Sequence, residues 1–223
     1  MKDLGKRIEL HSHSFFSDGE LLPSELRRRA EALNYERIFI TDHADSSNLE
    51  SVVSKIARVA KEFEKHSVRV SCGVELTHIQ PETIRKLARE ARRLGAELVI
   101  VHGETIVEPV PPNTNRTALE CGEVNVLAHP GLITIEDCEL ARENDVYLEL
   151  SARTGHCLTN GHVAQCALKA GAKLIVCTDL HGPSDFITQT HAYEIALGSG
   201  LSEDQALKAV RDNPRSLVRK LST

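Results

Sequence analysis

Histidines and carboxylates near the start of the chain are spaced as metal ligands could be. Residues Arg7 to Leu10 alternate polar and apolar side chains and predict a short strand, which His11 and His13 follow. Alternate residues of a strand point to one face, so the two imidazoles should face the same spot. After a turn, Asp18 can bring a carboxylate back to them. Imidazole suits zinc, manganese and iron, and carboxylate adds harder oxygen, so this stretch is typical of a divalent metal site.

The same residue types recur where later strands are expected to end. A lone pair of neighbouring histidines is more often an ordinary surface or core feature, so the recurrence carries the prediction. The strand-end residues are His11, His13, Asp18, His43, Glu75, His102, His129, Asp179 and His181, and they include six of the eleven histidines. If these residues were polar only because the ends of strands are generally polar, we would expect a mixture of Ser, Thr, Asn and Lys instead. So many ligands exceed one tetrahedral zinc and suit two or three ions that share a carboxylate.

The elements that must position these residues alternate regularly. Short apolar strands are expected near residues 7–10, 37–43, 68–76, 97–101, 124–128, 146–150 and 173–178, with amphipathic helices between them. Two more helices are expected at about 186–197 and 202–212, the last ended by Asn213 and Pro214. This alternation predicts the α/β class, with a parallel sheet wrapped by helices. Ligands at six strand ends can meet only around the mouth of a closed barrel, so a barrel is favoured over an open sheet.

Composition limits the classes of function. A chain of 223 residues, 41% hydrophobic and 26% charged, predicts one domain over residues 1–223. A net charge of −5 without a long basic run argues against strong nucleic-acid binding. No apolar run is long enough to span a membrane, and the N-terminus lacks the apolar segment of a secretory signal. Six scattered cysteines then indicate reduced thiols, so a cytoplasmic location is expected.

Six pieces of the sequence resemble the PHP family, the polymerase and histidinol phosphatase superfamily. They are HSHSFFSDG at 11–19, TDH at 41–43, GVE at 73–75, His102, AHPG at 128–131 and TDLH at 178–181, in the family's order. The resemblance implies a distorted, TIM-like (β/α)7 barrel with a trinuclear metal centre at the C-terminal ends of its strands. It implies a first ion on His11, His13, Glu75 and Asp179, a second on Glu75, His102 and His129, and a third on Asp18, His43 and His181. No motif position is missing, which argues against a purely structural or binding domain.

The loop after the sixth expected strand holds further candidates. Arg153 stands where the family often places a phosphate-binding arginine, and a guanidinium matches phosphate oxygens at two points. His156, in the same loop, is a second candidate for substrate contact. The sequence leaves open whether His156, His162 or His78 donates a proton to the leaving group.

The expected activity is hydrolysis of a small phosphomonoester, of the histidinol phosphate type, by a hydroxide that bridges two or three zinc, manganese or iron ions. Glu75 and Asp179 would hold this centre, and Arg153 would help to stabilise charge on the phosphoryl oxygens. Glu104 and Glu108 would suit an amine-bearing leaving group. The alternatives are a nucleotide phosphodiesterase or 3′,5′-bisphosphate nucleotidase of the same fold, an amidohydrolase-like enzyme that cleaves C–N bonds, and a metal-dependent binding domain. A carboxylated lysine would favour amide cleavage, but no expected strand ends in Lys.

Overall fold

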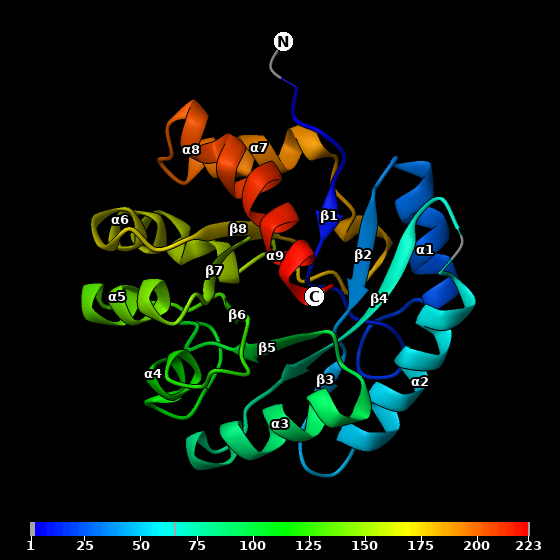
Figure 1. The fold of residues 1–223 in the computed structure, drawn as a ribbon. Coiled ribbons are helices and arrows are strands. Elements are labelled where there is room, and N and C mark those ends of the chain that lie inside the picture. The colour runs from blue at the N-terminus through cyan, green and yellow to red at the C-terminus, as the bar shows by residue number, and fades with distance from the viewer. Residues whose placement is uncertain (1–2, 65, 223) are drawn as a thin grey trace.

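The computed structural model describes residues 3–64 and 66–222 and contains a nearly closed barrel of parallel strands (Figure 1). The strands pair in the order β1 (Ile8–Glu9), β2 (Arg37–Ile40), β4 (Arg69–Leu76), β5 (Leu98–His102), β6 (Val126–Ala128), β7 (Tyr147–Ser151) and β8 (Leu174–Cys177). The expected strand at 37–43 is divided, because a short β3 (His43–Ala44) pairs with the far end of β4. The predicted α/β barrel is therefore confirmed.

The barrel closes through a seam between β1 and β8. Beyond the two strands, Ser12 and Leu180 form an isolated parallel bridge. Toward the N-terminal ends of β1 and β8, buried side chains take the place of hydrogen bonds between the two backbones. One carboxylate oxygen of Glu9 accepts the backbone N–H of Thr178 at 3.1 Å, and the Arg7 guanidinium donates to a β8 carbonyl at 3.3 Å. Buried polar groups need such partners, so these side chains satisfy the backbone along the gap.

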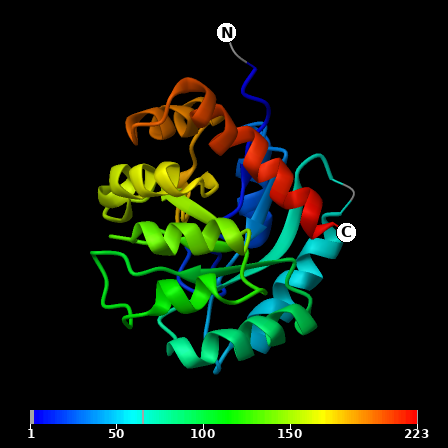
Figure 2. The same cartoon turned by 60° about the vertical axis from the view of Figure 1, so that its left-hand side comes forward.

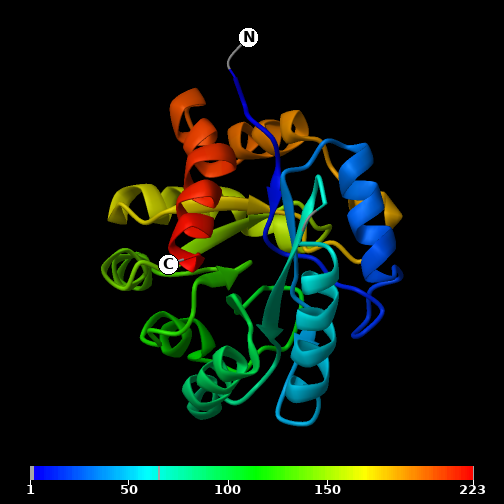
Figure 3. The same cartoon turned by 45° about the vertical axis from the view of Figure 1, so that its right-hand side comes forward.

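Helices cover the outside of the barrel. They are α1 (Pro23–Ala32), α2 (Leu49–Glu62), α3 (Ile84–Leu94), α4 (Thr114–Leu119), α5 (Ile135–Glu143), α6 (Asn160–Ala170), α7 (Gln189–Gly198) and α8 (Glu203–Leu207). Figure 2 shows α4, α5 and α6 stacked side by side, and Figure 3 shows α2 along β4. Their apolar faces bury the outward-facing strand residues in one continuous core. No helix of the described residues is long and apolar enough to cross a membrane.

The C-terminal helix covers the N-terminal opening of the barrel. The prediction that Asn213 and Pro214 end the last helix is wrong, because a π turn (Lys208–Asp212) leads into α9 (Asn213–Leu221). Pro214 lies in the first turn of α9, where a missing N–H leaves no helical hydrogen bond unmade. Leu217 packs with the apolar residues inside the barrel, and α9 crosses the centre of Figure 1 in front of the strands.

Candidate metal centre

The nine predicted ligands lie together at the C-terminal ends of the strands. His11, His13 and Asp18 follow β1, His43 lies in β3, Glu75 in β4 and His102 in β5, while His129 follows β6 and Asp179 and His181 follow β8. Six of them are buried, whereas His43 and His181 are partly buried and Asp18 is exposed. The parallel barrel places these strand ends around one mouth, so residues far apart in sequence share one site.

The first group surrounds the carboxylates of Glu75 and Asp179. His11 Nε2 lies 3.4 Å from Glu75 Oε1 and 3.5 Å from Asp179 Oδ1. His13 Nε2 lies 3.1 Å from Asp179 Oδ1 and 3.7 Å from Glu75 Oε2. Ligand atoms of His11, His13 and Asp179 thus lie within 4.8 Å of one another, with Glu75 beside them, and all are of the types preferred by zinc, manganese and iron.

A second group adjoins the same carboxylate oxygen of Glu75 as His11 does. His129 Nε2 is 3.7 Å from Glu75 Oε1. Ring nitrogens of His102, His129 and His156 lie within 4.8 Å of one another. His156, which the sequence suggests as a substrate contact, is therefore also near enough to these two to act as a ligand.

The third group lies nearest the solvent. Asp18 Oδ1 is 3.5 Å from His43 Nε2 and 3.2 Å from His181 Nε2. His43 Nδ1 is 2.7 Å from Glu75 Oε2, so this group adjoins the same carboxylate as the other two. Glu75 lies within 4 Å of a histidine of each group, as expected of a carboxylate that bridges ions, and Asp179 does so too.

Unpaired buried atoms show that these residues suit metal ions. Among the described residues, His11 Nε2, Glu75 Oε1 and Asp179 Oδ1 have no hydrogen-bond partner, and neither ring nitrogen of His13 or His129 has one. Buried polar atoms without partners are costly and uncommon in native proteins. Divalent cations at the centre of the cluster would satisfy His11 Nε2, the two carboxylate oxygens and one ring nitrogen each of His13 and His129.

The carboxylates and two of the histidines of the cluster are held in the ionisation states that bind metals. Burial raises the pKa of Glu75, but the adjacent His11 and His43 outweigh this and hold it well below its usual range. Burial and the neighbouring His43 lower the pKa of His13 to about 3. Burial and His102 likewise hold the pKa of His129 well below its usual value. Ionised carboxylates and neutral imidazoles are the forms that bind metals. Burial lowers the pKa of His11, His43 and His102, but nearby carboxylates outweigh this and raise it, so metal binding would have to displace protons from these three imidazoles.

A buried glutamate that the sequence did not single out orients His11. Glu149 on β7 lies with Oε2 at 2.7 Å from His11 Nδ1, which directs Nε2 toward the cluster. Carboxylates commonly hold metal-binding histidines in this way. Its one signal in the sequence is a charged residue within the otherwise apolar strand YLEL.

The mouth of the barrel contains a cavity of about 250 Å³, and Arg153 is part of its wall. The Nη1 atom of Arg153 donates to the Asp179 carbonyl at 3.2 Å and lies 2.7 Å from His181 Nδ1. Arg153 is partly buried, and its guanidinium is therefore held beside the predicted ligands. This places a phosphate-matching group next to the metal centre.

Of the other candidate residues, some line this cavity and others lie away from it. Glu108 lines the same cavity, with Oε2 at 3.0 Å from Nε2 of both His102 and His78. Glu104 is instead structural, since its carboxylate accepts the backbone N–H of Asn115 at 2.9 Å. His162 lies on α6 and donates to a backbone carbonyl at 2.8 Å, away from the residues that line the cavity.

The backbone of the site is strained at three residues. His78, His129 and Asp179 have φ values of 52°, 26° and 48°, a left-handed region that residues with a side chain seldom adopt. Each such residue costs about 1–3 kcal/mol, and such costs concentrate at functional sites. Surrounding contacts must therefore hold the site in place.

Comparison with known proteins identifies the family. A family model described as the PHP domain matches residues 9–175. An uncharacterized protein of Methanocaldococcus jannaschii is 44% identical over 217 residues, which cover 96% of this chain and all of that protein. A ribonuclease P protein component 3 of Methanosarcina barkeri is 26% identical, with 91% of this chain and 85% of that protein aligned.

Solved structures share the barrel. Histidinol phosphate phosphatase from Lactococcus lactis, complexed with zinc, L-histidinol and phosphate, aligns with a TM-score of 0.58 at 17% identity, covering 97% of this chain and 94% of that one. Ochratoxinase from A. niger aligns with a TM-score of 0.60 at 13% identity, covering 95% and 71%. These likenesses show the fold, whereas the family model matches the sequence over more than half of the chain. The chain belongs to the PHP domain family.

Proposed function

We propose that the protein is a metal-dependent phosphoesterase that hydrolyses small phosphomonoesters. The observation that carries the proposal is the convergence of nine ligand-type side chains and Arg153 on one mouth of the barrel. A complete ligand set would be costly for a protein that binds no metal, because its buried atoms would stay unpaired.

The residues of the site would divide the work between metal binding and phosphate binding. Glu75, Asp179 and the surrounding histidines would hold two or three divalent ions, which supply Lewis acidity toward phosphoryl oxygens and activate water. The guanidinium of Arg153 would donate hydrogen bonds to the phosphate and stabilise charge on its oxygens. No nucleophilic side chain is required, because water is the attacking group in this chemistry.

The substrate is proposed to carry an amine on its leaving group, as histidinol phosphate does. Glu108 lines the cavity, so its carboxylate can contact a cation that enters the mouth. The same barrel fold occurs in a histidinol phosphate phosphatase whose crystal structure contains L-histidinol and phosphate. Glu104 contributes nothing to this preference, because its carboxylate is bound to backbone in the loop.

A substrate screen of the metal-loaded protein tests the proposal. We expect histidinol phosphate and other small monoesters to have a higher kcat/KM than 3′,5′-bisphosphates, cyclic nucleotides, single-stranded DNA or amides. A preference of about tenfold for any of the nucleotide substrates, which is a difference of about 1.4 kcal/mol in transition-state binding, would replace the monoester assignment. Hydrolysis of an amide alone would favour the amidohydrolase alternative.

Replacing Arg153 should separate substrate binding from metal binding. Arg153→Ala removes charge-assisted hydrogen bonds to phosphate, so kcat/KM should fall about 10- to 100-fold. Metal content should not change, because Arg153 is not among the predicted ligands. Arg116→Ala, which removes an exposed arginine of α4, is the matched control and should leave both quantities unaffected. Unaltered kcat/KM in Arg153→Ala would exclude this residue from phosphate recognition.

A role in an RNA–protein complex is the second candidate, because curated relatives of similar length are named ribonuclease P protein component 3. The test is binding to structured RNA with and without a chelator. Specific RNA binding that persists without metal, together with no phosphatase activity, would favour this candidate over the phosphoesterase.

A further inference from the structure

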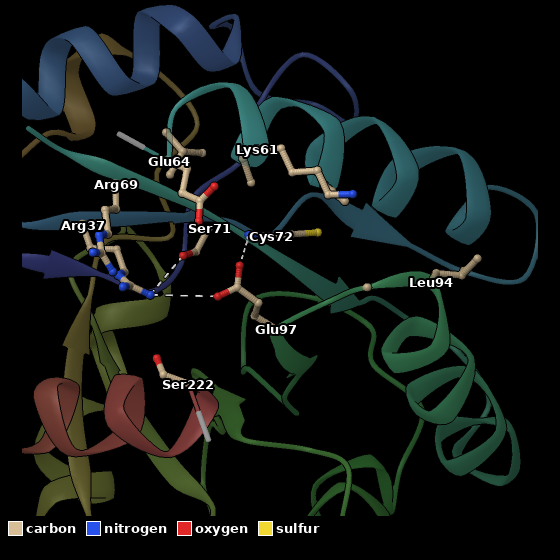
Figure 4. Close-up of a pocket in the computed structure, with 13 residues that line it drawn as sticks. Arg37, Lys61, Glu64, Arg69, Ser71, Cys72, Leu94, Glu97 and Ser222 are labelled. Carbon is tan, nitrogen blue, oxygen red and sulfur yellow. Dashed lines mark hydrogen bonds and ion pairs between the residues drawn. The ribbon is translucent and has the colours of Figure 1, made fainter. Parts of the chain in front are cut away.

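A second cavity lies at the end of the barrel opposite the metal centre. It has a volume of about 470 Å³ and is bordered by the first residues of β2 and β4 and the last turns of α2 and α3 (Figure 4). Its charged and hydroxyl-bearing lining includes Arg37, Lys61, Glu64, Arg69, Ser71 and Glu97. None of these residues belongs to the predicted ligand set, so the cavity is a separate feature.

Two arginines stand side by side in this cavity. The register of β2 and β4 places Arg37 directly opposite Arg69. Like charges opposed across neighbouring strands repel and lower stability. Within the described part of the chain, no side chain forms an ion pair or a hydrogen bond with the Arg69 guanidinium. The protein therefore brings two positive charges together, and among the described residues one distant carboxylate, that of Glu97, forms an ion pair with either of them.

Arg37 is short of hydrogen-bond acceptors. It is only 8% exposed, yet its one hydrogen bond to a described residue goes to Ser71 Oγ at 3.2 Å (Figure 4). Glu97 Oε2 lies 3.9 Å away, too far for a hydrogen bond, and the other oxygen of Glu97 accepts the Cys72 N–H. A guanidinium has five N–H donors, so most of those of Arg37 can still serve a ligand.

We propose that this cavity binds a compact oxyanion, such as the phosphate group of a small metabolite, between Arg37 and Arg69. A guanidinium fork pairs with phosphate oxygens in two-point geometry, and the hydroxyl of Ser71 can add a donor. Three cationic side chains outnumber the two carboxylates in the lining. Apolar residues of α2 and α3, Ala60 and Leu94, complete the wall against which the rest of such a molecule can pack.

Titration of the metal-free full chain with inorganic phosphate tests the proposal. Backbone amide resonances of Ser71, Cys72 and Gly95, which line the cavity, should shift saturably, and sodium chloride at matched ionic strength should not reproduce the shifts. Arg37→Gln and Arg69→Gln should each weaken this binding about tenfold or more, because each removes charge-assisted hydrogen bonds. Arg89→Gln, which removes an exposed arginine of α3, is the matched control and should bind phosphate normally.

Phosphate at the mouth of the metal centre is the alternative explanation of any shift, and Arg153→Ala distinguishes the two. Shifts that vanish in Arg153→Ala but persist in Arg37→Gln would overturn the proposal. Unchanged affinity in Arg69→Gln, or equal shifts with chloride, would overturn it as well. Arg69 is exposed, so its replacement still tests phosphate binding even if Arg37→Gln does not fold. The titration involves no turnover, so its failure is distinct from failure of the phosphoesterase.

Discussion

Glu149 is the residue on which the orientation of His11 depends. Its carboxylate lies 2.7 Å from His11 Nδ1 and directs Nε2 toward the cluster. Glu149→Gln keeps the size of the side chain but loses the charge that favours this contact. Metal affinity should therefore fall about 10- to 100-fold, as is usual when a carboxylate behind a histidine ligand is removed.

Competition with a chromogenic chelator measures that affinity. Glu143→Gln, at an exposed position of α5, is the control and should bind metal as the unmodified chain does. Equal affinity in Glu149→Gln and the control would mean that Glu149 does not act through His11.

Single residues of the site differ in how well the sequence predicts them. The pair His11 and His13 follows from the two-residue period of a strand, which is a local property. Glu149 lies 138 positions from His11, and their contact exists only because the closed barrel turns a side chain of β7 toward the residue that follows β1. Local spacing could not indicate this contact. The same holds for Glu108, whose neighbours come from the ends of other strands.

At the scale of elements, Gly131 allows the loop after β6 to pack closely against the loop after β5. Its φ is +62°, and a Cβ atom there would lie 1.9 Å from the Glu104 carbonyl oxygen. Gly131→Ala must displace backbone beside His129, so the free energy of unfolding should fall by about 1–3 kcal/mol. Urea unfolding measures this change. Gly122→Ala is the control, since no atom lies within 4 Å of its Cβ position, and equal stability of the two variants would contradict the steric role.

Strands and helices could be predicted where their apolar residues recur at a regular spacing. The alternation of short apolar segments with amphipathic segments predicted the strands and the helices around them. One exception is α9, because Pro214 is compatible both with the end of one helix and with the first turn of another. Packing of Leu217 inside the barrel opening decides between these, and that contact is tertiary.

At the scale of the whole molecule, barrel closure was predictable but the form of the seam was not. Ligands at six strand ends required a ring, and the parallel strands form one. The gap between β1 and β8 is instead filled by the charged side chains of Arg7 and Glu9. These residues have the pattern of polar positions in a half-exposed strand, although both are buried.

The most direct test is to measure metal content and phosphatase activity on the same sample. The shared position of Glu75 among three ligand groups predicts about two to three divalent ions per chain after reloading with zinc, manganese or iron. Chelation should abolish hydrolysis of a phosphomonoester, and restoring the metal should recover it. One ion or fewer per chain after reloading, or hydrolysis that is unchanged by complete chelation, would contradict a metal-dependent phosphoesterase with a multinuclear centre.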